Sequence, residues 1–389
     1  MTRDNELGGR AAMAAVAAMI AVLFAGSTVL TPLYVIYKQA FGFSQITLTL
    51  VYAVYVLGNL AALLMFGRVS DVIGRRPAAL AAMAVAVVSA LFFLFAENVA
   101  WLDIARILSG LGIGVGAGTG TAWLAELVAT DDKSRAAIIA TSTNFFGLGL
   151  GALAAGLLAE YAPWPLRLTF VVYLAVLALV AALVWRTRET ISQPGKLADI
   201  SMQPRFSVPG EIRAGFVAPA VTGFGAMALV GFYAALAPSI LAQQLHVTNH
   251  ALAGALFFEM AIVAAVTILV TTRLSSRSTM LAALALMIPT VVLVVAMAIM
   301  IAATAFCGVA AALGYRGGLQ VVNQIAPASR RAEVVSAFFI CCFCGNALPV
   351  IGIGILSTVI SATMASLAFA GMITIFSLVA LAFGARYAR

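Results

Sequence analysis

Long apolar runs alternate with short polar, charge-bearing segments along nearly the whole chain. Each run holds about 20 residues or more, the length that a helix needs to cross the hydrocarbon core of a bilayer. The pattern therefore predicts twelve membrane-spanning helices, of which the turn near residue 300 is the least marked boundary. The first predicted span ends near residue 37. The other eleven cover 46–66, 78–96, 100–126, 135–160, 166–185, 214–242, 250–272, 279–298, 301–324, 332–358 and 362–384.

The longest polar stretch, 186–213, separates the first six spans from the last six. It contains Lys196, Gly195 and two prolines, a composition typical of a linker. Similar segments, 126–136 and 323–332, each precede a glycine-rich run in their own half. We therefore predict an all-α membrane protein with two pseudo-symmetric six-helix bundles, 1–185 and 214–389, joined by a linker at 186–213.

Composition and charge placement support a membrane protein. Hydrophobic residues make up 63% of the chain and charged residues 9%, far from the values of soluble domains. Most of the 22 Lys and Arg residues lie at the two ends and in alternate loops, which explains the net charge of +8 without nucleic acid as a partner. The distribution predicts a multi-pass protein of the cell (plasma or inner) membrane, with both termini in the cytoplasm and an uncleaved first helix.

The sequence contains no motif that is typical of catalysis or metal binding. Its four cysteines, Cys307, Cys341, Cys342 and Cys344, lie inside apolar runs with no nearby histidine or acid. No nucleophile triad, phosphate-binding loop or sizeable soluble segment occurs. We predict no enzyme activity, metal site or cofactor, and a membrane enzyme or a receptor is a disfavoured alternative.

One charged loop, 67–77, stands between the second and third predicted spans. It carries Gly67, Asp71, Gly74, Arg75 and Arg76, and its arginines place it in the cytoplasm. The pattern Gly-x-x-x-Asp-x-x-Gly-Arg-Arg resembles the signature between helices 2 and 3 of the major facilitator superfamily. The chain is identified as resembling bacterial twelve-helix members of the drug/proton-antiporter kind.

The resemblance implies a gating role for this loop. It implies that Asp71 faces the N-terminus of the eleventh helix and that Arg75 pairs with Glu126 at the end of the fourth. One departure is Val72, where the family often carries a basic residue. The alternative is a basic loop that sets topology and has no part in gating.

The fourth predicted span opens with Arg106, followed by a glycine-rich face that includes Gly110 and Gly114. This resembles the helix-4 motif of the superfamily, in which the arginine is associated with proton coupling. A charge within a span costs at least about 2.5 kcal/mol on insertion scales, so Arg106 needs a partner or a function. Snorkelling to the membrane surface and pairing with Asp103 are the structural alternatives.

Two further charges lie within predicted spans of the second half. Glu259 is near the middle of the eighth, where apolar surroundings favour the protonated form and suit reversible protonation. Arg316 lies in the tenth between glycines that leave room for a ligand or a close helix. The sequence leaves two possibilities open, a role in substrate or proton binding and a structural salt bridge between these two residues.

The fifth predicted span contains Gly147, Gly151 and Gly156. Their spacing resembles the antiporter motif Gly-x-x-x-Gly-Pro-x-x-Gly-Gly, although Ala152 replaces the proline. Small residues at this spacing would serve close helix packing equally well.

The combined pattern predicts a secondary transporter that works by alternating access. Proton-coupled export of a small amphiphilic or drug-like compound is the favoured function. Proton-linked uptake or exchange of a small organic anion is the alternative, suggested by Arg106 and Arg316. The expected partners are a small-molecule substrate, protons and the lipid bilayer, and we expect a monomer.

Overall fold

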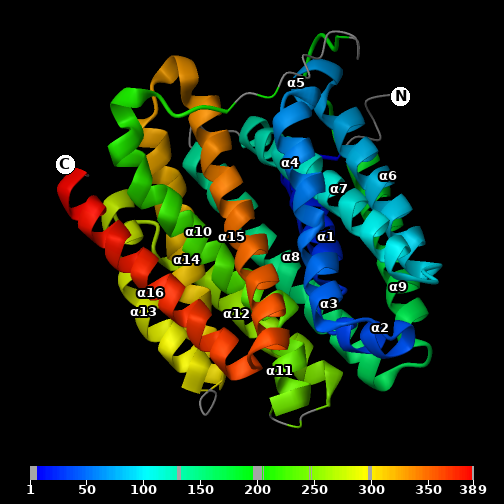
Figure 1. Ribbon diagram of the computed structural model, residues 1–389. Coiled ribbons are helices and arrows are strands. Elements are labelled where there is room, and N and C mark those ends of the chain that lie inside the picture. Colours follow the sequence, from blue (N-terminus) through cyan, green and yellow to red (C-terminus); the bar gives the residue numbers. More distant parts are fainter. Residues whose placement is uncertain are drawn as a thin grey trace. The chain divides into compact units, whose positions relative to one another are not determined.

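The computed structural model describes residues 7–128, 133–195, 204, 206–244, 246, 248–296 and 300–387. These residues form α-helices joined by short connections, and the described part contains no β-strand. Twelve helical stretches within it are long and apolar enough to cross a membrane (Figure 1). The turn predicted near residue 300 falls on 297–299 and much of the predicted linker on 196–203, both outside the described residues.

The helices of the first half are α1 (Gly9–Thr28), α2 (Tyr34–Phe41), α3 (Gln45–Ala53), α4 (Tyr55–Met65), α5 (Val69–Ile73), α6 (Arg75–Leu94), α7 (Val99–Leu127), α8 (Lys133–Tyr161) and α9 (Pro165–Trp185). The second half contains α10 (Arg213–Ala235), α11 (Ala237–Gln244), α12 (His250–Val270), α13 (Ser276–Ala296), α14 (Met300–Ile325), α15 (Arg331–Val359) and α16 (Ala362–Tyr387). Two short 3-10 helices, η3 (Gly210–Ile212) and η4 (Ala328–Arg330), precede α10 and α15.

Two predicted spans are interrupted where the sequence pattern indicated continuous helices, and a third contains a local irregularity. The first run ends at Thr28 and resumes as α2, because Pro32 lacks the N–H that a continuing helix needs. The seventh breaks after α10, just before Pro238 in the first turn of α11. The second span, Gln45–Met65, contains one tighter turn at Val54, between α3 and α4, where the backbone keeps helical dihedral angles (φ −63°, ψ −23°).

The chain forms two compact units. Unit 1 consists of Met1–Phe41, Val54–Pro204 and His250–Gly254, and unit 2 of Gly42–Ala53, Arg205–Asn249 and Ala255–Arg389. Each half of the sequence supplies most of one unit. A segment of the second span and the first turn of the eighth belong to the unit built mainly from the other half.

Unit 1 is held together by apolar side chains from α1, α6, α7, α8 and α9. Trp123 of α7 is fully buried in this core, and its indole N–H donates to the backbone of Arg188 at 3.2 Å. The Tyr173 hydroxyl donates to the carbonyl of Val22 at 3.1 Å and joins α9 to α1. The core includes Met19, Ile20, Leu23, Met83, Ile113, Leu124, Leu177, Val180 and Val184.

Unit 2 is built on close contacts of α10 with α14 and α15. A Cβ on Gly345 of α15 would overlap the carbonyl of Phe224 on α10, and a Cβ on Gly231 would overlap that of Asn346. Such small residues let membrane helices approach closely. Close packing matters here because lipid tails are as apolar as the helix surfaces, so the hydrophobic effect does not drive the helices together. Prolines lie inside α10, α13 and α15, where neighbouring helices accommodate them.

Candidate functional site

The charged loop between the second and third spans has a defined backbone. α4 ends at Met65, the five-residue helix α5 follows, and Gly74 joins α5 to α6. Gly74 has φ of 103°, a conformation that residues with a side chain rarely adopt. A Cβ there would also lie 2.8 Å from Oε2 of Glu189, so both the backbone and the space require glycine.

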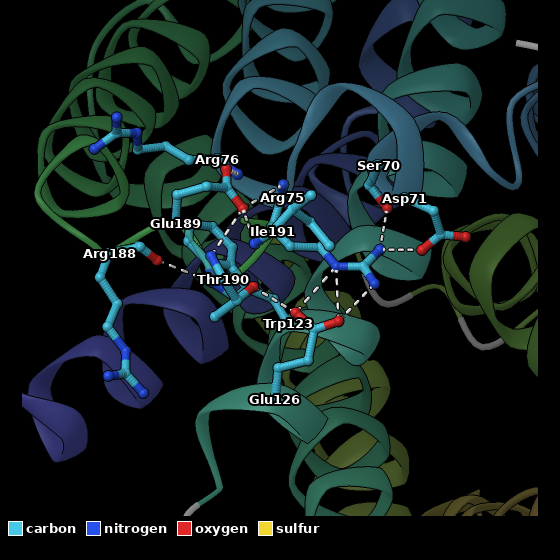
Figure 2. Close-up of polar contacts among 10 residues, drawn as sticks. All are labelled: Ser70, Asp71, Arg75, Arg76, Trp123, Glu126, Arg188, Glu189, Thr190 and Ile191. Atoms are coloured by element: carbon cyan, nitrogen blue, oxygen red, sulfur yellow. Dashed lines mark hydrogen bonds and ion pairs between the residues drawn. The ribbon is translucent and has the colours of Figure 1, made fainter. Parts of the chain in front are cut away.

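Arg75, the first residue of α6, lies at the centre of the loop (Figure 2). Its Nη1 donates to Oδ1 of Asp71 at 2.5 Å and to the Ser70 hydroxyl at 2.7 Å. Its Nη2 donates to Oε1 of Glu126 at 2.6 Å, and its Nε lies 3.2 Å from both oxygens of that carboxylate. The guanidinium thus bridges one acid of the loop and one acid at the end of α7.

The ion pairs of Arg75 differ in their exposure to solvent. The Arg75 side chain is 7% exposed, whereas the side chain of Asp71 is 54% exposed and that of Glu126 is 32% exposed. A planar guanidinium that meets a carboxylate through two donors forms a strong, geometrically defined pair. The Arg75–Glu126 contact is therefore the stronger link, and Asp71 adds a local, solvent-exposed one.

A third carboxylate, absent from the sequence-based candidates, completes the cluster. Glu189 follows α9 at the start of the predicted linker, and its two oxygens accept the backbone N–H groups of Arg75 at 2.9 Å and Arg76 at 2.8 Å. The first N–H groups of a helix have no partner within the helix, and its N-terminus favours negative charge. Glu189 therefore caps α6 from more than 100 residues away in the sequence.

The rest of the linker's first segment also lies on the loop. The Thr190 hydroxyl bonds to Oε2 of Glu126, so the acid that holds Arg75 is itself held by the linker. The backbone N–H of Gly195 donates to the carbonyl of Val72 at 2.7 Å. Residues 186–195 are thus an ordered part of the cluster, and the polar composition that predicted a linker gave no sign of this docking.

The two neighbouring arginines of the loop have different surroundings. Arg76 places its guanidinium 6.0 Å from the ring centre of Trp185, at the end of α9. Its backbone N–H, as described above, is bound by Glu189. Arg75 therefore makes the ion pairs of the loop, while Arg76 contributes a cation–π contact and a capped amide.

Arg106 lies inside unit 1 with 1% of its surface exposed, which excludes snorkelling. Its Nη1 donates to the carbonyl of Ser27 at 2.8 Å, and its guanidinium lies 4.8 Å from the ring centre of Tyr55. Tyr34 is within electrostatic reach of the same guanidinium. The predicted partner Asp103 is half-buried one turn earlier on α7, and the contacts of Arg106 described here go instead to α1 and α4.

The glycines of the two motif-like spans lie at close helix contacts. On α7, a Cβ at Gly110 would overlap the carbonyl of Tyr55, and one at Gly114 would overlap the Cβ of Ala62 on α4. On α8, Gly147 and Gly151 face the backbone of α1, and Gly156 faces the carbonyl of His250. These positions need small side chains for packing.

Glu259 and Arg316 are not joined by an ion pair in the described residues of unit 2. The structural salt bridge considered from the sequence is therefore wrong. Arg316 donates instead to the Thr271 hydroxyl at 2.9 Å and the Thr272 carbonyl at 3.1 Å, where α12 has just ended. A cation at a helix C-terminus is stabilised by the helix dipole, which explains how Arg316 is accommodated without an acid.

Glu259 is half-buried on α12, next to the buried Met260, and Tyr233 of α10 is within its electrostatic reach. No group of three or more His, Cys, Asp or Glu residues suited to a metal ion occurs in the part of the chain that the structure describes.

Comparison with known proteins places the chain in a family. The model of the Major Facilitator Superfamily matches residues 16–277, more than half of the chain. The chain belongs to the major facilitator superfamily. The relatives and structures that it matches are transporters and not enzymes, and the predicted all-α fold is confirmed, with twelve candidate membrane spans in the described residues.

Relatives of this superfamily member match over parts of the chain. An uncharacterized transporter of Rickettsia felis is 31% identical over 123 residues, which are 32% of this chain and 29% of that protein. The multidrug resistance protein MdtL of Escherichia coli O45:K1 is 32% identical over 96 residues, 25% of this chain and 24% of MdtL. The chain thus spans less than a third of the length of these curated relatives.

Solved structures match over nearly the whole superfamily fold. A bacterial homolog of the human lysosomal transporter Spinster, in an inward-facing and unoccupied conformation, superposes with a TM-score of 0.72 at 15% identity. The match covers 99% of this chain and 97% of that one. At this identity the comparison shows the shared fold.

Proposed function

We propose that this transporter exports a small amphiphilic or drug-like molecule in exchange for protons, by alternating access. The observation that carries the proposal is the isolation of Glu259. A carboxylate within an apolar span is expensive when ionised, so a retained one indicates a function such as proton transfer. Glu259 forms no ion pair with Arg316 in the described residues, so the sequence alternative of a structural salt bridge does not explain why the acid is there.

Protonation would couple Glu259 to transport through its charge. The neutral carboxyl is compatible with apolar surroundings, and the ionised form needs water or a cation nearby. A transporter that exposes this group alternately to the two sides of the membrane would therefore bind a proton on one side and release it on the other. A cationic or polar substrate would compete with the proton for the same carboxylate.

The Arg75 cluster would act as a latch at the cytoplasmic end of unit 1. The resemblance to the superfamily signature supports this role, and so does the convergence of α5, α6, α7 and the linker on one guanidinium. We also propose that both termini lie in the cytoplasm and that the protein resides in the inner membrane. Reporter fusions that are active on one side of the membrane test the position of each terminus.

The alternative function, transport of a small organic anion, has less support from the described contacts. Arg316 is bound to the end of α12, and Arg106 is bound to a carbonyl and an aromatic ring. The partial match to MdtL, whose name describes multidrug resistance, favours export. The two functions remain distinguishable by experiment.

The test uses protein reconstituted in proteoliposomes with ethidium as a probe cation and benzoate as a probe anion. Under an imposed pH gradient, we expect ethidium accumulation that is lost in Glu259→Gln, while exchange of ethidium without a gradient persists. Glu97→Gln, in an exposed loop, is the matched control and should accumulate ethidium normally. Gradient-driven accumulation by Glu259→Gln at the wild-type rate would move the proton site elsewhere, and transport of benzoate alone would favour the anion function.

A further inference from the structure

A small cavity lies inside unit 1, where α1, α6, α7 and α9 meet. Its volume is about 10 Å³, close to the least that one water molecule needs. A drug-like compound, a lipid chain or a hydrated ion is too large for this space. The cavity therefore fits a single molecule of the size of water.

Three hydroxyl groups line the cavity, and they come from three helices. Ser89 belongs to α6, Ser109 to α7 and Tyr173 to α9. Both serines are buried, with 3% and 6% of their surface exposed. Cavities that stay dry are lined by apolar groups, whereas a buried water molecule binds to two to four polar groups. The three hydroxyls therefore favour a cavity that holds water.

The hydroxyl of Ser109 is the group that most needs a partner. It forms no hydrogen bond with any residue that the structure describes, although Ser109 is buried and lines the cavity. A serine inside a helix can donate to the carbonyl four residues earlier, but that carbonyl, of Ala105, receives the Ser89 hydroxyl at 2.7 Å. Because a buried hydroxyl without a partner is destabilising, Ser109 would hold a water molecule within its reach.

The other two hydroxyls have already donated their protons and can still accept. Ser89 donates to Ala105, and Tyr173 donates to the carbonyl of Val22 at 3.1 Å. Each hydroxyl oxygen also has lone pairs for a second hydrogen bond. One water molecule has two protons for these two oxygens and a lone pair for the proton of Ser109. The three groups thus match one water molecule in number and in kind.

Gly26 of α1 makes room for one of these groups. A Cβ at this position would overlap Oη of Tyr173. Any residue other than glycine would therefore push the tyrosine hydroxyl away from the cavity. The close approach of α1 to α9 at Gly26 is what allows this hydroxyl to reach the site.

The remaining lining of the cavity is apolar and uncharged. It includes the buried side chains of Phe93, Ile113 and Phe170. A cation would need several oxygen ligands, among them carboxylates or carbonyls, and an anion would need a positive charge or several donors. An uncharged molecule that both donates and accepts hydrogen bonds fits this lining, and water is the one that is small enough.

From these observations we infer that the cavity binds one water molecule, which accepts from Ser109 and donates to Ser89 and Tyr173. This water molecule joins α7 to α6 and α9. It lies about one turn along α7 from Arg106, which donates to the carbonyl of Ser27 on α1. It is therefore a further polar link of α7 within unit 1, at the level of the buried arginine, and it does not depend on which compound is transported.

X-ray radiolytic footprinting of the full-length protein in lipid nanodiscs tests for this water molecule. Radiolysis converts a bound water molecule to a hydroxyl radical, which labels the side chains next to it. We expect Phe93 and Phe170 to be labelled about tenfold faster than Phe338, an equally buried residue of α15 that does not line the cavity. Equal labelling of the three phenylalanines would mean that the cavity is dry and would overturn the inference.

Two variants test which groups hold the water molecule. Ser109→Ala removes the proton donor and Tyr173→Phe removes an acceptor, so each should lower the labelling of Phe93 and Phe170 about fivefold. Ser377→Ala is the matched control, because Ser377 is equally buried but lies on α16 in unit 2, and it should leave this labelling unchanged. Unchanged labelling in Ser109→Ala or in Tyr173→Phe would overturn the proposed set of hydrogen bonds. Because the measurement uses no substrate, its failure is separate from a failure of the transport assay.

Discussion

The loop after the second span and the loop after the eighth occupy corresponding places in the two halves of the chain. The cation lies in the loop in the first half, and on the span that contacts the loop in the second half. In unit 1 the loop supplies the cation, Arg75, and the fourth span supplies the acid, Glu126. In unit 2 the tenth span supplies the cation, Arg316, and the end of α12 supplies neutral acceptors, Thr271 and Thr272. The same two elements are joined in each half, but an ion pair joins them in one and a helix dipole in the other.

The helices that follow these loops are also capped differently. The N-terminus of α6 receives both oxygens of Glu189, which comes from the linker. The N-terminus of α13 receives the hydroxyl of Ser275, which accepts the N–H of Ser278 at 3.2 Å in an ordinary local cap. The N-terminus of α6 is therefore capped by a distant segment, whereas that of α13 is capped by its own loop. A contact that depends on a distant segment is the kind that a conformational change can break.

The largest difference should appear when each arginine loses its charge. Arg75→Gln leaves two carboxylates around a buried position without their cation, at an expected loss of about 2–3 kcal/mol in the free energy of unfolding. Arg316→Gln loses an interaction with a helix C-terminus, worth about 1 kcal/mol. Unfolding in mixed detergent micelles, monitored by circular dichroism, measures both.

A second charge removal separates the ion pair from simple loss of packing. In Arg75→Gln/Glu126→Gln the less exposed of the two unpaired acids is gone and only the solvent-exposed Asp71 remains, so the double variant should be more stable than Arg75→Gln alone. If the double variant is the less stable of the two, the contribution of Arg75 is not mainly electrostatic. The described acceptors of Arg316, the Thr271 hydroxyl and the Thr272 carbonyl, are neutral and offer no such recovery partner.

The joint between α5 and α6 should be the next most sensitive point. Gly74→Ala forces a side chain into φ of 103° and against the Glu189 carboxylate, at an expected loss of about 2 kcal/mol. Gly352→Ala is the matched control, because it lies in α15 with open space around it and should be neutral or slightly stabilising. Thermal unfolding of the two purified variants compares them, and equal midpoints would show that Gly74 is not constrained.

The sequence carried the signals for the Arg75–Glu126 pair but not for the rest of the cluster. The loop motif identifies both residues through a resemblance that fixes their spacing and their helices. Glu189 caps α6 only because the linker folds back on the loop, a tertiary event that leaves no periodic mark in the sequence. The available signal was the pair Glu189-Thr190 just after an apolar span. Because the whole segment is polar, this pair cannot be told apart from ordinary linker residues by composition.

In the second half, too, the sequence pattern predicts which residues lie within spans, and helix packing determines which contacts they make. Hydropathy places Glu259 and Arg316 within spans but does not determine how the helix faces are oriented or how high each residue sits. Arg316 meets α12 twelve residues further along than Glu259, at the helix end, where backbone acceptors are free.

The caps should show a smaller effect that is confined to a few amide groups. Glu189→Gln keeps one acceptor oxygen and loses the other, so the N–H groups of Arg75 and Arg76 should exchange with deuterium about fivefold faster. Ser275→Ala should speed exchange at Ser278 by a similar factor without affecting α6. Exchange measured by mass spectrometry on peptides from both loops resolves the two sites.

The two capping variants should then differ in their reach. Because Glu189 belongs to the linker, its loss should also speed exchange in 190–195 and around Glu126, whereas the Ser275 variant should leave every distant peptide unchanged. Exchange confined to the first turn of α6 in Glu189→Gln would mean that the linker stays docked through Thr190 and Gly195 alone.

The smallest effect on stability, and the sharpest test of the latch, is expected at Asp71. Its carboxylate is 54% exposed and pairs with Arg75 at 2.5 Å, so Asp71→Asn should cost less than about 1 kcal/mol. The latch proposal nevertheless expects reduced transport and greater reactivity of cysteines placed toward the cytoplasmic end of the transport path. Since the local ion pair is weak, a large change in reactivity would show that Asp71 acts on gating and not on the stability of the loop. Normal reactivity in a folded but inactive Asp71→Asn variant would reject the latch and leave the loop with a local structural role.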